Sequence, residues 1–194
     1  MHIIRLFSSD DYKGQRGYLD TQKVYEIIRT ILYFSFSLSI FFIGWFHLKT
    51  RSNLLSILAV LFLLPASKSA VNMIMFLRYK SCDRENADLI DAESGEMNGL
   101  YDCVFTSYEK NYSIAHLVVK GSTICGFSEN KDFDEQSFDK HLNDILAKEN
   151  YKNVSIKIFN DRKKYLERLQ QLKTIDADET YTSGILETIK NVIL

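Results

Sequence analysis

Residues 31–48 read ILYFSFSLSIFFIGWFHL, and residues 54–77 read LLSILAVLFLLPASKSAVNMIMFL. Because a helix rises about 1.5 Å per residue, about 20 apolar residues cross the hydrocarbon core of a bilayer. Each stretch is close to that length, and only the five residues KTRSN separate the two. The sequence therefore predicts a transmembrane helical hairpin over residues 27–78, preceded by an N-terminal segment over residues 1–26.

The basic residues predict how the hairpin is oriented, since Lys and Arg are enriched on the cytoplasmic side of membrane spans. They are denser outside the two stretches than between them: Lys13, Arg16, Lys23, Arg29, Arg78, Lys80 and Arg84 against Lys49 and Arg51. The first stretch lacks the small residues of a signal-peptide cleavage site, so it should stay in the mature chain. We expect a multi-pass membrane protein with both termini in the cytoplasm.

The charge balance differs between the two parts of the chain. Residues 1–78 hold nine Lys and Arg against four Asp and Glu, and residues 79–194 hold fifteen against twenty-one. The parts therefore carry +5 and −6, which sum to the net charge of −1. An acidic domain lacks the basic face that binds phosphates of DNA or RNA, so we expect no nucleic-acid partner.

Residues 100–194 have the pattern of a small α+β domain. Runs of β-branched and aromatic residues predict strands over 101–107, 112–119, 122–127 and 154–159. Apolar residues at helical spacing predict three helices, in the order β-β-β-α-β-α-α, with Asp161 capping the second helix. We expect a cytoplasmic domain with an antiparallel three- to four-stranded sheet covered by helices. Residues 79–99 should form an acidic linker or a helical extension of the second span.

Two expected pairs, Ser107 with Tyr112 and Val119 with Ser122, set the register of the first three strands. In this register one face of the sheet collects the larger side chains, and we expect the core on that face. The residues of this face are Tyr101, Cys103, Phe105, Ile114, His116, Val118, Cys125 and Phe127.

The same register places Cys103, His116 and Cys125 in one row across three strands, which raises the possibility of a zinc site. Strands lie about 4.8 Å apart, so the outer Cβ atoms would be about 10 Å apart, whereas sulfurs on one zinc lie within about 4 Å. We therefore expect a core histidine between two buried thiols and no metal; a Cys–His catalytic pair is the alternative.

Glu129 and Lys131 follow the third predicted strand, and their side chains would share one side of an extended chain. The order of a helix, three strands, a helix and a strand resembles that of restriction-endonuclease-like nucleases, an analogy of fold and not of activity. His116 stands on the second strand, where a metal-binding acid would be needed. We expect a solvated charged loop; a membrane-tethered enzyme or an inactive relative of these nucleases is the alternative.

Lys68 lies within the second span, one turn after Pro65, the only proline of the chain. Counted from Leu54 it is about 21 Å deep and about 9 Å from the cytoplasmic edge, a distance that a lysine can snorkel. The alternatives are a contact with a partner subunit and a role in an oligomeric pore or transporter.

No glycine loop for phosphate, no catalytic triad and no cofactor motif stands out, so we expect no cofactor and no catalysis. Three cysteines without paired spacing indicate free thiols in a reducing compartment, and Cys82 beside the second span should be unmodified. The expected function is that of a membrane-anchored protein presenting its domain for binding, sensing or assembly. Its partners would be the lipid bilayer and a protein or second copy, met through the hairpin or the C-terminal helix.

Overall fold

The computed structural model describes residues 10–48, 54–95, 97–108, 110–175 and 177–194. The chain divides into two compact units. The first unit contains Leu19–Lys80, and the second joins Asp10–Tyr18 to Ser81–Leu194. The second unit is therefore discontinuous in sequence, because the chain leaves it, forms the first unit and returns.

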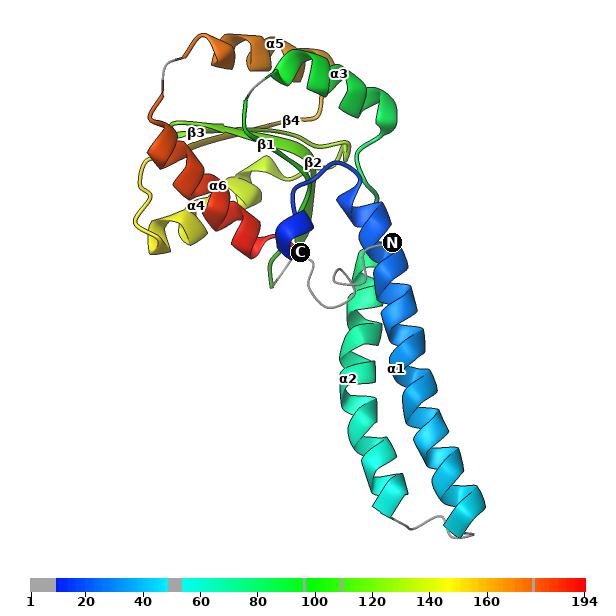
Figure 1. Cartoon of the computed structure of the whole chain (residues 1–194). Coiled ribbons are helices and arrows are strands. Elements are labelled where there is room, and N and C mark those ends of the chain that lie inside the picture. The colour runs from blue at the N-terminus through cyan, green and yellow to red at the C-terminus, as the bar shows by residue number, and fades with distance from the viewer. Residues whose placement is uncertain (1–9, 49–53, 96, 109, 176) are drawn as a thin grey trace. The chain divides into compact units, whose positions relative to one another are not determined.

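The first unit is built on two long helices, α1 (Tyr18–Leu48) and α2 (Leu54–Leu77) (Figure 1). Both are long and apolar enough to cross a membrane, by length and composition. The existence of two such helices is confirmed, and α1 begins well before residue 31, where the apolar stretch starts.

Small and polar side chains form the contact between α1 and α2. The Thr30 and Ser69 hydroxyl oxygens lie 2.9 Å apart, and the Ser37 hydroxyl donates to the carbonyl of Ala59 at 2.8 Å. These four residues are buried. The rings of Phe36 and Phe62 also meet between the helices, with centroids 5.0 Å apart. Most of the other large apolar side chains are exposed: Ile31, Leu32, Leu38, Phe42, Ile43, Leu54, Ile57, Val60, Leu61, Leu64, Val71, Ile74 and Leu77.

The second unit has the α+β fold class expected from the sequence. Along the chain its elements are α3 (Arg84–Ser94), β1 (Gly99–Thr106), β2 (Asn111–Lys120), β3 (Thr123–Phe127), α4 (Glu135–Lys148), β4 (Ser155–Phe159), α5 (Arg162–Lys173) and α6 (Glu179–Val192). Asp161 accepts hydrogen bonds from the amides of Lys163 and Lys164 and caps α5, as predicted. Part of the segment expected as a linker forms α3, a helix of this unit.

The four strands lie in the order β1-β2-β3-β4. The first three pair antiparallel, as expected, but β4 pairs with β3 in parallel. The expectation of an antiparallel sheet throughout is therefore wrong. The reason is the helical connection: α4 carries the chain back along the sheet before β4 begins, which is the geometry of a parallel crossover.

The strand register differs by two residues from the expected one. Tyr112 pairs with Phe105, and Val119 pairs with Ile124. Gly121, with a φ of 58°, opens the turn between β2 and β3. Within β1, Asp102 has a φ of 57° and interrupts the alternation of side chains between the two faces.

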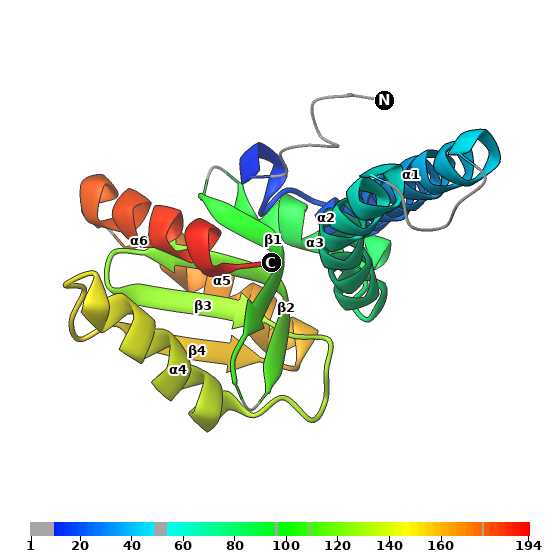
Figure 2. The ribbon, with the colours of Figure 1, turned by 90° about the horizontal axis from the view of Figure 1, so that it is seen from below.

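Helices cover both faces of the sheet, α3 and α5 on one side and α4 and α6 on the other (Figures 1 and 2). The expectation of a single core face is therefore wrong, because both faces are buried. The core under α4 and α6 includes Leu100, Cys103, Phe105, Ile114, Leu117, Val119, Ile124, Phe138, Leu142, Leu146, Ile185 and Ile189. The core under α3 and α5 contains Ala87, Ile90, Tyr101, Ala115, Val118, Cys125, Phe127, Tyr165, Leu169 and Leu172.

Residues from both ends of the second unit close the outer edge of β1. The amide of Tyr101 donates to the carbonyl of Gly14 at 2.8 Å, and the amide of Leu194 donates to the carbonyl of Val104 at 3.0 Å. Lys13 adds a hydrogen bond to the carbonyl of Ile193 at 3.0 Å. The segment that precedes α1 is thus bound to the sheet, and an edge that could pair with another chain is covered.

Candidate functional site

His116 lies in the core under α3 and α5 and is 1% exposed. Its Nδ1 is 2.7 Å from the hydroxyl of Tyr165, and its ring centroid is 4.3 Å from that of Tyr101. Burial lowers the pKa of His116 to about 4, and the charge of Asp91 opposes this shift. The imidazole is therefore neutral at neutral pH and makes an aromatic and hydrogen-bonded contact inside the domain.

A polar network leads from this core to the surface. The Tyr101 hydroxyl donates to Asp91 at 2.5 Å. Arg16, from the segment before α1, donates to Asp91 at 2.8 Å and to Asp88 at 2.6 Å. The network joins that segment to α3 and β1, so its first role is to hold the second unit together.

The expected row of Cys103, His116 and Cys125 across the sheet is wrong, because His116 pairs with Tyr101 and Phe127. Cys103 is opposite Ile114 and belongs to the core under α4 and α6, whereas Cys125 is opposite Val118 and belongs to the other core. Burial raises the pKa of both thiols, which makes them poor nucleophiles and poor metal ligands.

Glu129 and Lys131 are not brought together in one site. The Glu129 carboxylate accepts hydrogen bonds from the amide of Asp83 at 3.0 Å and from the side chain of Asn86 at 2.7 Å. A carboxylate at this position satisfies the N-terminus of α3. Lys131 is exposed, and its carbonyl accepts a hydrogen bond from Asn160. Within the described residues, no group of three or more His, Cys, Asp or Glu side chains could hold a metal ion.

Cys82 is the most accessible of the three thiols, and its environment makes it unreactive. Its Sγ lies 3.8 Å from a carboxylate oxygen of Glu129, and its amide donates to Asp102 at 2.8 Å. Burial, and then the charge of Glu129, raise the pKa of Cys82 from 9.0 to about 12. Acylation or alkylation of this thiol is correspondingly disfavoured.

We predict slow labelling of Cys82 by N-ethylmaleimide at pH 8 in the folded full-length protein. A thiol with a pKa of about 12 has about a thousandfold less thiolate at pH 8 than a thiol with the ordinary value of 9.0. Mass spectrometry over time measures the labelling rate. Glu129→Gln should accelerate the reaction severalfold, and Glu167→Gln, on the exposed side of α5, should not. Labelling of the native protein at the rate of a free thiol would contradict the prediction.

Lys68 lies on an exposed face of α2, one turn after Pro65. Among the residues that the structure describes, it has no ion-pair partner. The neighbouring Ser67 hydroxyl turns back to the carbonyl of Leu63 at 2.7 Å.

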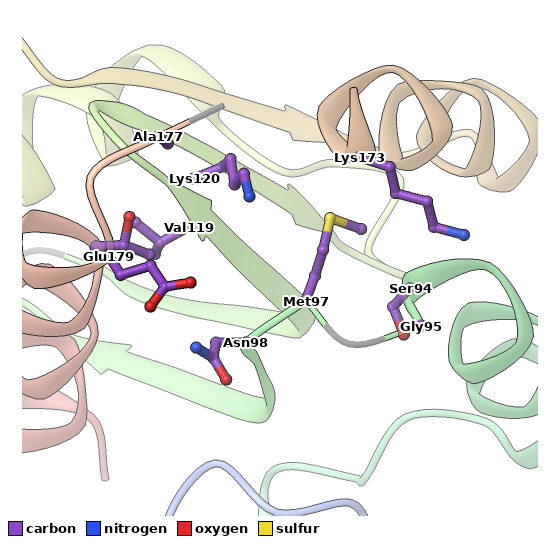
Figure 3. Close-up of a pocket in the computed structure, with 10 residues that line it drawn as sticks. Ser94, Gly95, Met97, Asn98, Val119, Lys120, Lys173, Ala177 and Glu179 are labelled. Carbon is purple, nitrogen blue, oxygen red and sulfur yellow. The ribbon is translucent and has the colours of Figure 1, made fainter. Parts of the chain in front are cut away.

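A pocket at one end of the sheet was not apparent in the sequence. Its volume is about 480 Å³, and it lies entirely within the second unit. Ends of several elements meet there (Figure 3), and the lining residues are Ser94, Gly95, Met97, Asn98, Val119, Lys120, Lys173, Ala177, Glu179 and Thr182. Because these residues are dispersed along the chain and form no motif, no sequence pattern could have found them.

The lining is polar and carries charges of both signs. In Figure 3, Lys120, Asn98 and Glu179 lie toward one side of the pocket and Lys173 toward the other, with Met97 between them. Among the described residues, neither lysine has an ion-pair partner. Two cations without counter-charges and a carboxylate in a pocket of this size can bind a small anionic ligand.

The wall of the pocket is fixed by a contact between the β2–β3 turn and α6. The amide of Gly121 donates to the hydroxyl of Thr182 at 2.9 Å. A Cβ atom on Gly121 would lie 3.2 Å from the side chain of Ala177, so the turn approaches the chain before α6 closely. The pocket is therefore held by backbone geometry as well as by side chains.

No protein-family model matches the chain, and neither a curated protein nor a solved structure matches it. Its function is therefore inferred from its own residues and geometry.

Proposed function

We propose that this chain is a two-span membrane protein that presents its second unit at the cytoplasmic surface for binding, without catalysis. The observation that carries the proposal is the inverted polarity of the α1–α2 pair. Hydroxyl groups and alanines are buried in the contact between the helices, together with one Phe36–Phe62 ring contact, while large apolar side chains such as Leu38 and Leu64 face outward.

A pair of helices in water would have the opposite pattern, with apolar side chains between the helices and polar ones outside. In lipid, small residues let helices approach closely, and hydrogen bonds such as that between Thr30 and Ser69 find no competing water. The apolar outer faces then contact acyl chains. This pattern supports a bilayer as the environment of both helices.

The discontinuity of the second unit supports two complete crossings. Asp10–Tyr18 and Ser81–Leu194 belong to one folded unit, although α1 and α2 lie between them in sequence. A chain that leaves this unit and rejoins it must return to the same side of the membrane, as a hairpin does. The excess of Lys and Arg outside the hairpin favours the cytoplasmic side.

The roles of the candidate residues support binding over catalysis. His116 is neutral and hydrogen-bonded inside a core, and Glu129 satisfies the N-terminus of α3. The apolar face of α6 is also occupied, since Ile185 and Ile189 lie in the core of its own unit. A contact with a protein or a second copy is therefore proposed for the hairpin, where Lys68 and the outer faces are exposed, and not for α6.

The order of the elements in the second unit supports the alternative of an inactive relative of restriction-endonuclease-like nucleases. The second unit has the order of α3, three strands, α4 and β4 that suggested this resemblance. Use of Glu129 as a helix cap, apart from Lys131, favours an inactive member over a working nuclease.

We predict that the chain resists carbonate extraction from microsomes and that its two glycosylation acceptors stay bare. Asn111 and Asn153 are exposed and carry Ser two residues later, so a luminal domain would be modified there. Gel mobility before and after glycosidase treatment shows whether either acceptor carries a glycan. Residues 10–18 linked to residues 81–194 behind a cleavable secretory signal serve as the control and should receive glycans. Release by carbonate would overturn the membrane proposal, and a glycan on the full chain would overturn the orientation.

A further inference from the structure

We infer that the pocket lined by Lys120, Lys173 and Glu179 binds a mononucleotide. The inference specifies what the second unit binds, and it therefore rests on the proposed function of binding. Its geometry depends only on residues of the second unit.

The two lysines reach the pocket from opposite sides (Figure 3), and the phosphate would lie between their long, flexible side chains. They come from different elements, the end of β2 and the last turn of α5, and both line the same pocket. A phosphate monoester carries nearly two negative charges at neutral pH, which matches two ammonium groups. Lysine binds phosphate as a compact point charge with three donors, so no fixed fork geometry is needed.

The remaining lining residues offer groups for a sugar and a base. Asn98 and Glu179 lie away from Lys173 (Figure 3), and their side-chain oxygens accept hydrogen bonds from hydroxyl or amino groups. Met97 and Val119 add apolar surface, and a polarizable methionine suits the face of an aromatic ring. A ligand with an anionic end, hydroxyl groups and a flat ring satisfies all of these features.

Size and charge favour a single nucleotide over a polymer. A volume of about 480 Å³ is in the range of ligand pockets and leaves room for one nucleotide. The acidic balance of residues 79–194, fifteen basic against twenty-one acidic side chains, repels a long polyanion. The local pair of lysines can still attract one phosphate, because charges a Debye length away are largely screened.

The test is calorimetric titration of the full-length protein in detergent with AMP, GMP, CMP and UMP. At least one nucleotide should bind with a Kd below about 1 mM. Inorganic phosphate, the matching nucleoside and glycerol 3-phosphate, which stands for a lipid headgroup, should each bind at least about tenfold more weakly. These comparisons distinguish a nucleotide site from a site for free phosphate and from a site for a lipid headgroup.

Lys120→Gln and Lys173→Gln should each weaken binding of that nucleotide by about tenfold, because each removes one charge from the phosphate site. Lys163→Gln, an exposed lysine in the first turn of α5 outside the pocket, is the matched control and should bind like the wild type. Equal thermal unfolding temperatures show that the variants remain folded.

The inference is overturned if none of the four nucleotides binds, if glycerol 3-phosphate binds as tightly as the best nucleotide, or if the two lysine variants keep full affinity. Carbonate extraction is measured on the same protein. A chain that stays in the membrane but binds no nucleotide rejects the ligand alone, and a chain released by carbonate rejects the membrane role alone.

Discussion

Residues 81–194 expressed without the segment Asp10–Tyr18 should be less stable than the complete second unit by at least about 3 kcal/mol. Removal of this segment leaves the Tyr101 amide on β1 without its bond to Gly14 and uncovers Leu100, which packs against that glycine. Each lost hydrogen bond costs about 1 kcal/mol, and exposing a leucine costs about 2 kcal/mol. A loss of at least about 3 kcal/mol is large against the roughly 5–15 kcal/mol that stabilise a small domain.

The matched experiment joins residues 10–18 to residues 81–194 through a flexible Gly/Ser linker. This version should unfold in urea, as followed by circular dichroism, at a clearly higher midpoint concentration than residues 81–194 alone. In the full chain, Gly14→Val should reproduce part of the loss. Gly14 has a φ of 78°, and a Cβ there would lie 2.6 Å from a methyl carbon of Leu100. Gln15→Ala, at an exposed position, should have little effect. Equal stability of the two shortened chains would contradict the prediction.

Features set by local pattern could be predicted from the sequence. Phe138, Leu142 and Leu146 recur at helical spacing, and all three are buried in α4 as that spacing requires. Asp161 precedes a run of helix-forming residues and accepts their first free amides. The two apolar stretches likewise became long helices, because their length and composition leave little choice.

Features set by distant contacts could not be predicted. The sequence of α3 is polar, and its N-terminus is satisfied by Glu129, more than forty residues away. The alternation of side chains along β1 is interrupted at Asp102, whose positive φ is rare for a residue other than glycine. The pocket depends on Lys120 and Lys173, which only the folded sheet and helices bring together. In each case the deciding partner lies outside any local window of sequence.

His116 should make the second unit lose stability as the pH falls from about 6.5 to about 4. Burial lowers its folded-state pKa to about 4, while an unfolded histidine titrates near 6.5. Above pH 6.5 the imidazole is neutral in both the folded and the unfolded protein, and the free energy of unfolding has its full value. Between these values only the unfolded state takes the proton, so the free energy of unfolding falls, by about 3 kcal/mol in total. Below pH 4 both states are protonated and the loss is complete.

The measurement compares the free energy of unfolding of the wild type and of His116→Gln in detergent at pH 7, 6, 5 and 4. Acidic side chains titrate in both proteins, so the difference between the two isolates His116. The variant loses the bond to the Tyr165 hydroxyl and should be less stable at pH 7, and the gap should shrink by about 3 kcal/mol at pH 4. His141→Gln, a partly exposed position on α4, is the matched control and should run parallel to the wild type. Parallel profiles for wild type and His116→Gln would mean that the imidazole is protonated in the folded domain, and the aromatic contact with Tyr101 would then have to accommodate a buried cation.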